Sequence, residues 1–141
     1  MSALLDTNVL IYASDKTSLF HGVCRELRAG GTTGRHALCV TPQVLLEYVA
    51  VVTNPRRVVA PRTPAEAWAE VGKLRCAFAV ILHAPTYLDK LEQLATILQP
   101  KGAEVFDLSI AATMLAAGIN EIYTYDSAVF GKVPGLVVRT P

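Results

Sequence analysis

The fold is decided by the stretch ALLDTNVLIY at residues 3–12, where a short apolar run ends at an acid and a second apolar run follows. The run at 2–5 predicts a strand that is buried on both faces, as in a parallel sheet. Asp6 then stands at the carboxyl end of this strand, where open α/β sheets place their functional groups. Asp6 is equally suited to cap a helix that begins at Thr7. The two roles are compatible, because a capping residue at a strand end can also face a cleft.

The rest of the chain alternates between the same two kinds of element. Further strands are predicted at 37–40, 78–82, 121–125 and 136–139. Helices are predicted at 7–14, 18–28, 42–52, 64–76, 86–99 and 105–117, with the second ended by Gly30-Gly31. Alternating strands and helices indicate βαβ units. We therefore expect one domain over residues 1–141, an α/β protein with three α/β/α layers around a mainly parallel sheet of four to five strands.

Composition narrows the class of protein. Hydrophobic residues make up 52% of the 141 residues, which argues against disorder. No apolar stretch reaches the roughly 18 residues of a membrane span, and no signal peptide is apparent, so we expect a cytoplasmic protein. Cys24, Cys39 and Cys76 are scattered and odd in number, and the histidines are dispersed. This favours reduced core cysteines over a zinc site or a disulfide framework.

Three further acids stand in unusual places. Glu47 lies in a helix that is apolar on nearly every face, where a carboxylate needs an ion pair, an exposed rim position or a polar cleft. Asp107 begins the helix at 105–117, a position that also suits the helix dipole. Asp126 follows the strand at 121–125, repeating the strand-then-acid pattern of Asp6, although an Asp-Ser pair is also common in turns.

Taken together, the four acids point to a metal site. Two of them end parallel strands and therefore meet at one edge of the sheet. Four converging carboxylates would repel one another unless a cation lies between them. An all-oxygen ligand set favours Mg²⁺, or Mn²⁺, over zinc. With these four acids in one cleft, the remaining surface carries 13 basic groups against eight acidic ones, which suits contact with a phosphate backbone.

Four segments resemble the motifs of the PIN domain, in order and over nearly the whole chain. They are LLDTNVL at 4–10, LEY at 46–48, FDLSIAAT at 106–113 and YTYD at 123–126. The length of the chain and the segment VPGL at 133–136 resemble those of VapC-type toxins of bacterial toxin–antitoxin pairs. The resemblance implies a central first strand and a Mg²⁺-dependent endoribonuclease that cleaves RNA. It also implies a homodimer that is inhibited by a cognate antitoxin.

The resemblance also assigns roles to residues. Asp6, Glu47, Asp107 and Asp126 would be the catalytic and metal-site carboxylates, with Asp6 and Asp107 holding the principal metal. Asn8 would orient Asp6 by hydrogen bonding, and Thr7 would line the cleft. Many relatives carry a further acid two residues after the one that matches Asp126, and here that position is Ala128. A second metal is therefore expected to bind weakly or only with RNA.

Several alternatives and one surface prediction remain open at this point. A haloacid-dehalogenase-like phosphatase would need a second aspartate at the position of Asn8. A PIN-like module that binds RNA or a protein partner without cleavage is a second alternative, because Ala128 stands where many relatives carry an acid. The basic residues expected to line the RNA path are Arg35, Arg56, Arg57, Arg62 and Lys101, although each also suits ordinary solvated surface.

Overall fold

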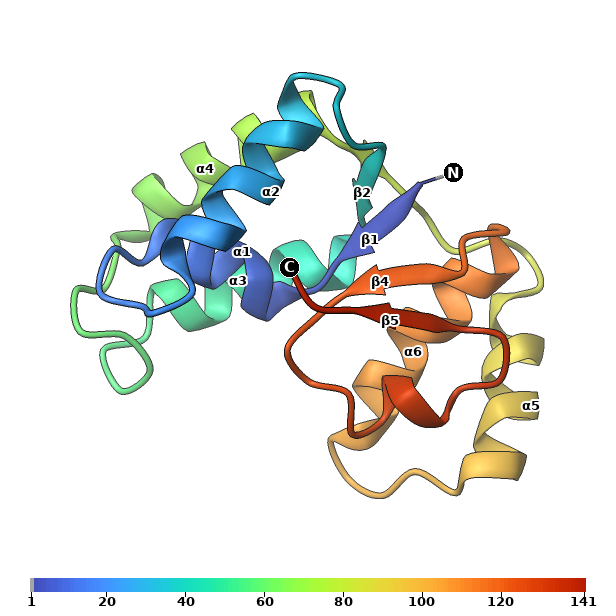
Figure 1. The fold of residues 1–141 in the computed structure, drawn as a ribbon. Helices are drawn as coiled ribbons and strands as arrows, with labels where there is room; N and C mark the ends of the chain where they lie inside the picture. The colour runs from blue at the N-terminus through green and yellow to red at the C-terminus, as the bar shows by residue number, and fades with distance from the viewer. Residues whose placement is uncertain (1) are drawn as a thin grey trace.

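The computed structural model describes residues 2–141, and its centre is a sheet of five parallel strands in the order β3-β2-β1-β4-β5 (Figure 1). β1 therefore lies in the middle, as expected. The strands are β1 (Ala3–Leu5), β2 (Leu38–Val40), β3 (Ala79–Val80), β4 (Glu121–Tyr123) and β5 (Val137–Arg139). Every neighbouring pair is parallel, which confirms the predicted α/β class and brings the carboxyl ends of β1 and β4 to one edge.

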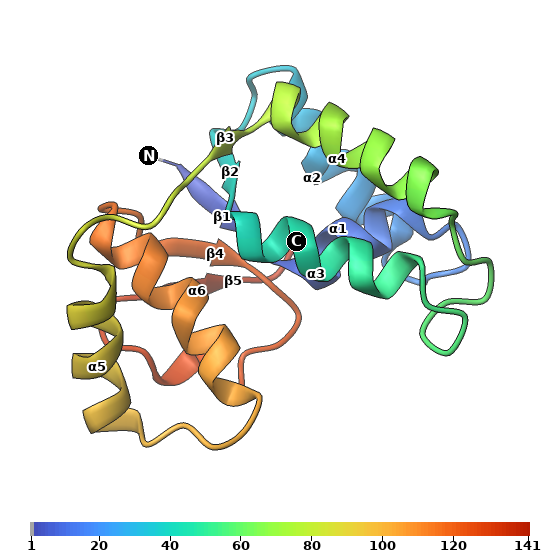
Figure 2. The ribbon, with the colours of Figure 1, turned by 180° about the vertical axis from the view of Figure 1, so that it is seen from behind.

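Helices cover both sides of the sheet. They are α1 (Thr7–Ser14), α2 (His21–Thr32), α3 (Pro42–Val52), α4 (Pro64–Ala77), α5 (Tyr87–Leu98) and α6 (Glu104–Ala116), with a short 3₁₀ turn η1 (Phe130–Lys132). Figure 2 shows α5 and α6 packed together in front of β4 and β5, with α3 and α4 on the same side. In Figure 1, seen from the opposite side, α1 and α2 lie nearer the viewer. The expected three-layer arrangement is therefore present.

The helix starts follow local side-chain chemistry. The hydroxyl of Thr41 accepts a hydrogen bond from the backbone N–H of Val44, and Pro42 occupies the first turn of α3. Thr63 and Glu66 form a reciprocal capping box at the start of α4. The end of α6 is followed by Gly118, which has φ +77°, a conformation that glycine adopts without strain. These boundaries agree with the sequence because short-range contacts decide them.

Two predictions were wrong. Gly30-Gly31 does not end α2, which continues to Thr32. A Cβ atom on Gly31 would lie 2.5 Å from the ring of Phe78 and 2.7 Å from Leu38, so this glycine allows the helix to pack closely on β2 and the chain before β3. Cys76 is exposed, whereas the other two cysteines are buried. It lies in the last turn of α4, on a side of the helix that is open to solvent.

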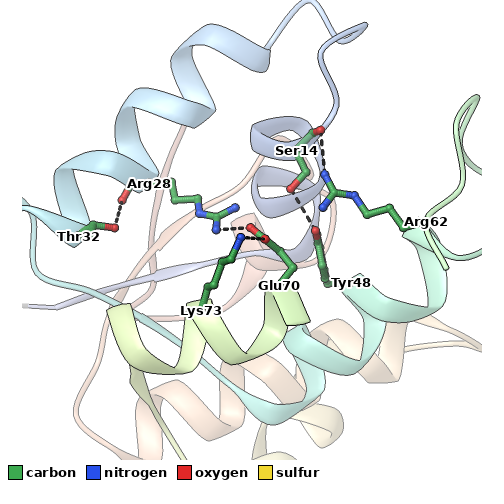
Figure 3. A network of polar contacts seen from close by, with 7 residues as sticks. All are labelled: Ser14, Arg28, Thr32, Tyr48, Arg62, Glu70 and Lys73. Carbon is green, nitrogen blue, oxygen red and sulfur yellow. Dashed lines mark hydrogen bonds and ion pairs between the residues drawn. The ribbon is translucent and has the colours of Figure 1, made fainter. Parts of the chain in front are cut away.

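Polar contacts join the helices at the far end of α1 from Asp6 (Figure 3). Arg28 of α2 forms an ion pair with Glu70 of α4. The fully buried Tyr48 of α3 shares a hydrogen bond of 3.1 Å with the hydroxyl of Ser14. Arg62 donates to the carbonyl oxygen of Ser14. The two contacts of Ser14 hold the carboxyl end of α1 against α3 and the segment before α4.

Within residues 2–141, the helices lack the length and the apolar composition that crossing a membrane requires.

Candidate active site

Asp6 occupies the junction between β1 and α1. Its side chain is almost completely buried and caps α1, with Oδ1 accepting a hydrogen bond of 2.7 Å from the backbone N–H of Thr7. Oδ2 accepts a second bond of 2.7 Å from the hydroxyl of Thr124 and a longer one of 3.3 Å from the amide of Asn8. The backbone N–H of Asp6 continues the parallel ladder to Tyr123 of β4. The carboxylate is therefore both a helix cap and a fixed group at the sheet edge.

Glu47 reaches the same place from the middle of α3. It is half-buried, and its Oε2 accepts a hydrogen bond of 2.9 Å from the hydroxyl of Thr7. Oε1 accepts one of 2.9 Å from the amide of Gln43, which also donates to the backbone carbonyl of Phe106 at 2.8 Å. The ion pairs among the described residues do not include Glu47. Both oxygens of this carboxylate are therefore held by neutral donors.

The remaining two acids come from the other half of the chain. Asp107 lies in the first turn of α6 and is half-buried. Asp126 is exposed in the segment after β4, where its Oδ1 accepts the backbone N–H of Ala128 at 3.1 Å. The backbone N–H of Asp126 in turn donates to the hydroxyl of Thr124. Asp126 is thus a turn residue, as its sequence allowed, while it shares Thr124 with Asp6.

The acids of the cluster shift the pKa values of one another. Burial raises the pKa of Asp6 to about 6, against hydrogen bonds from Thr124 and from the backbone of Thr7 that lower it. The nearby negative charges of Glu47 and Asp126 add to this rise. The charges that shift the pKa of Asp6 are thus both negative, and each disfavours ionisation of its carboxylate.

Asp107 belongs to the same group of charges. Its pKa is also raised to about 6, first by burial and then by the surrounding carboxylates. Those carboxylates are Asp6, Asp126, Glu47 and Glu104. All four acids predicted from the sequence therefore interact around the carboxyl ends of β1 and β4.

Three residues of this cluster were missed in the sequence. Glu104 lies one helical turn before Asp107, a spacing of three that places both on neighbouring positions of α6. Gln43 lies four residues before Glu47, again one turn away on the same helix. Thr124 follows β4 directly and lies two residues before Asp126. The helical spacing offered a signal for the first two, whereas the contact from Thr124 to Asp6 joins residues 118 apart.

The predicted basic residues do not all lie near the acids. Arg35 precedes β2 and so lies at the opposite, amino-terminal edge of the sheet, where its side chain contacts Thr33. Arg62 contacts Ser14 at the far end of α1 from Asp6 (Figure 3). Arg56 and Arg57 are exposed in the turn after α3. Lys101 lies just before α6 and is the nearest along the chain to Asp107.

The donor set suits a hard divalent cation. All four groups are carboxylates, their charges are uncompensated, and Mg²⁺ prefers oxygen ligands of this kind. In the part of the chain that the structure describes, however, no three His, Cys, Asp or Glu side chains lie close enough together to hold a metal ion. The chemistry of the donors therefore fits the ion, while the side chains are spread more widely than a complete set of direct ligands.

Comparison with known proteins identifies the family. The PIN domain family model matches residues 3–136. The chain belongs to the PIN domain family. Ribonuclease VapC48 of Mycobacterium tuberculosis is 28% identical over 143 residues, covering 100% of this chain and 98% of the relative.

Two solved structures share the PIN domain fold along the full chain. The VapBC2 assembly of Rickettsia felis, bound to a DNA fragment from its promoter, has a TM-score of 0.73 at 18% identity and covers 100% of this chain and 99% of its own. The Mycobacterium tuberculosis toxin VapC20, which cleaves the sarcin-ricin loop, has a TM-score of 0.71 at 17% identity, with 99% of both chains covered. At these identities the two structures support the fold alone. The matched range of the family contains all four acids.

Proposed function

We propose that this PIN domain protein is a Mg²⁺-dependent endoribonuclease that acts as the toxin of a toxin–antitoxin pair. One observation carries the proposal: Asp6, Glu47, Asp107 and Asp126 gather around the end of the central strand, where burial and the charges of the neighbouring carboxylates raise the pKa values of Asp6 and Asp107 to about 6. The name of the similar Mycobacterium protein, a VapC ribonuclease, supports the same activity.

Each residue has a role that follows from its contacts. Asp6 is fixed by Thr124 and by the first turn of α1, so its carboxylate would be a preorganised ligand of the cation. Asp107, in the first turn of α6, would be a second ligand. Glu47, positioned by Thr7 and Gln43, accepts the proton of the attacking water or binds the cation. Asp126 completes the acidic wall at the solvent side.

The cation supplies chemistry that these side chains lack. When bound, Mg²⁺ or Mn²⁺ lowers the pKa of a water molecule and balances the charge that develops on the phosphodiester. Mg²⁺ keeps several of its own waters in proteins, so it needs few direct carboxylate bonds. The wide spacing of the acids agrees with binding in which some carboxylates act through water.

Cleavage of RNA by the purified, antitoxin-free protein tests the proposal. The wild type is incubated with a mixed RNA pool in Mg²⁺, in Mn²⁺ and in EDTA, beside the variant Asp6→Asn. Asp89→Asn is the matched control, because Asp89 is an exposed acid in the first turn of α5, away from the cluster. We expect products only with metal, their loss in Asp6→Asn, and their retention in Asp89→Asn. Circular dichroism confirms that the variants are folded.

Two outcomes would contradict the proposal in different ways. Equal cleavage by Asp6→Asn and the wild type would remove Asp6 from the mechanism. A folded wild type that binds RNA and yields no products would favour the binding module instead. That alternative has structural support, because Ala128 stands at the position of an expected acid. In addition, the backbone N–H of Ala128 donates a hydrogen bond to Oδ1 of Asp126, so this oxygen already has a partner.

The proposed partners are RNA, a cognate antitoxin and a second copy of the chain, within the cytoplasm. The Rickettsia felis structure is a VapBC assembly, which supports the antitoxin. Large apolar side chains that remain exposed support the homodimer: Leu46, Leu82, Leu88, Ile97 and Phe106. Light scattering, which measures the mass of the particle in solution, tests the homodimer. Leu88→Lys is expected to give monomers. Val59→Lys changes an exposed apolar residue between α3 and α4 and is expected to leave the dimer intact.

A further inference from the structure

Three aromatic rings meet beside the acidic cluster and form what we call the stacking platform, Tyr12, Phe20 and Tyr125. The ring of Phe20 stacks on that of Tyr125 with centroids 4.3 Å apart and planes inclined by 28°. Tyr12 contacts both rings at about 5.4 and 5.5 Å. The rings come from three separate segments: α1, the residue before α2, and the chain after β4 (Figure 1).

The platform is connected directly to the carboxylates. Tyr125 immediately precedes Asp126, and its backbone N–H donates to Oδ1 of Asn8 at 3.3 Å. The amide of the same Asn8 donates to Asp6 at 3.3 Å and to the hydroxyl of Thr124 at 3.1 Å. One asparagine therefore fixes the spacing between the aromatic rings and the acids.

The ring of Phe20 is open to solvent although its neighbours hold it in place. Phe20 is 42% exposed, and Leu19 beside it is 96% exposed. On the inner side, the thiol of buried Cys24 contacts the hydroxyl of Tyr125, which restrains the ring beneath Phe20. Phe20 and Leu19 therefore present adjacent apolar side chains to solvent, where they are available for contact with a ligand.

We propose that an unpaired nucleobase of the RNA substrate stacks on the exposed ring of Phe20, which sets the position of the neighbouring phosphodiester at the carboxylates. This inference rests on the ribonuclease function proposed above. Bases of single-stranded RNA bind aromatic side chains in this manner, and base pairs in a duplex leave no free face for it. The substrate class is therefore RNA with at least one unstacked base beside the cleaved bond.

The composition of the patch favours a base over a protein partner. Its centre consists of stacked rings, and it is joined to the acids by the chain from Tyr125 to Asp126 and by the hydrogen bonds of Asn8. The acidic cluster repels the phosphates of the RNA backbone until a cation is present. Stacking of a base on an aromatic ring does not depend on a cation, so it can hold the RNA where contacts to the phosphates are weak. The predicted cations Arg35 and Arg62 contact residues away from this edge and do not supply that contact.

The test uses fluorescence of 2-aminopurine, which is quenched when the base stacks. Single-stranded oligoribonucleotides carry this base at each position in turn and are bound to the non-cleaving Asp6→Asn protein in Mg²⁺. The added variants are Phe20→Leu, Phe20→Tyr and Trp68→Leu. Trp68 is the matched control, because it is an exposed aromatic residue on α4 outside the platform. Phe20→Leu keeps an apolar contact with Tyr12, and Tyr125→Leu provides a second way to disturb the platform.

Stacking on a protein ring contributes about 1–3 kcal/mol per base, so its loss corresponds to a roughly 5- to 140-fold weaker affinity. We expect a change in this range and loss of quenching for Phe20→Leu, with wild-type behaviour for Phe20→Tyr and Trp68→Leu. In the active protein, Phe20→Leu raises KM more than it lowers kcat. Unchanged affinity and quenching in folded Phe20→Leu would overturn the inference and leave the patch to a protein partner.

The two proposals fail separately. Cleavage of the RNA pool by the wild type depends on the acids and tests the ribonuclease function by itself. Quenching in the non-cleaving protein tests the platform whether or not products form. Cleavage without a Phe20 effect contradicts only the platform, and a Phe20 effect on quenching without cleavage contradicts only the nuclease.

Discussion

The hydroxyl of Thr7 donates a hydrogen bond of 2.9 Å to Oε2 of Glu47, and it joins the first turn of α1 to the middle of α3. Thr7 is buried and Glu47 is half-buried, so this bond is partly shielded from water. The other oxygen of Glu47 is held by Gln43. Two neutral donors, Thr7 and Gln43, thus fix the orientation of the Glu47 carboxylate.

Replacing Thr7 by valine removes this donor while preserving the branched shape. Loss of a residue that orients a metal-site carboxylate typically costs about 10- to 100-fold in activity or metal affinity. We therefore expect Thr7→Val to lower RNA cleavage by about this factor and to raise the Mg²⁺ concentration needed for half-maximal activity. Thr7→Ser keeps the hydroxyl and is expected to stay close to the wild type. Equal loss in both variants would show that packing, and not the hydrogen bond, is responsible.

The buried charge of Asp6 predicts an unusual dependence of stability on pH in the metal-free protein. Its pKa is raised from 3.8 to about 6, so the folded state binds a proton more tightly than the unfolded chain. Stability from this group is complete below the unfolded pKa and is lost as pH rises through the folded pKa. The shift corresponds to about 3 kcal/mol as an upper value.

Urea unfolding in EDTA, at several values from about pH 4 to pH 7, measures this effect. We expect the free energy of unfolding of Asp6→Asn, relative to the wild type, to rise by up to about 3 kcal/mol over this range. Groups outside the acidic cluster, such as Glu70, whose pKa is lowered by Arg28, titrate identically in both proteins. The difference between the two proteins therefore reports Asp6, together with the part of the Asp107 pKa shift that the charge of Asp6 causes. A difference that is independent of pH would mean that Asp6 ionises in its ordinary range.

Local chemistry explains how much of the fold was predictable. Thr41 and Thr63 begin helices through contacts three residues away, so the sequence contains the whole signal. The strands are shorter than predicted, because pairing with neighbours decides where each ends: Phe78 continues the apolar run but belongs to the end of α4. Gly31 looks like a helix terminator in isolation, and only its approach to Leu38 explains why the helix continues.

In the candidate site, too, some residues were predictable from the sequence and others only from contacts between distant elements. The acids were identifiable because a carboxylate among apolar residues stands out, as Glu47 does in α3. Their hydrogen-bond donors were not, because Thr124 and Gln43 are ordinary residues whose importance comes from partners in other elements. The aromatic platform was missed for a similar reason. Tyr12 fits the core pattern of α1, and nothing in the sequence indicates that Phe20 meets Tyr125.

The close packing of Gly31 against Leu38 and Phe78 predicts how alanine at this position changes the stability of the folded protein. Gly31→Ala forces the buried side chains of Leu38 and Phe78 to shift, and overpacking of this kind costs about 1–3 kcal/mol. Gly72 is the matched control, because it lies in α4 with no atom within 4 Å of an added Cβ. Gly72→Ala is expected to raise stability by about 0.5–1 kcal/mol. Thermal unfolding of both variants measures the contrast, and stabilisation by Gly31→Ala would show that α2 is not seated as described.

Binding of Mg²⁺ is expected to stabilise the folded protein, by about 2.7 kcal/mol at a free concentration 100 times the Kd. Asp107→Asn removes one proposed ligand and should abolish most of the rise in Tm, whereas Asp89→Asn should keep it. Because the pKa values of Asp6 and Asp107 are both about 6, protons compete with the cation, and the rise should shrink as pH falls below about 6. An equal rise in Tm for both variants, or one that persists in acid, would place the cation away from these carboxylates.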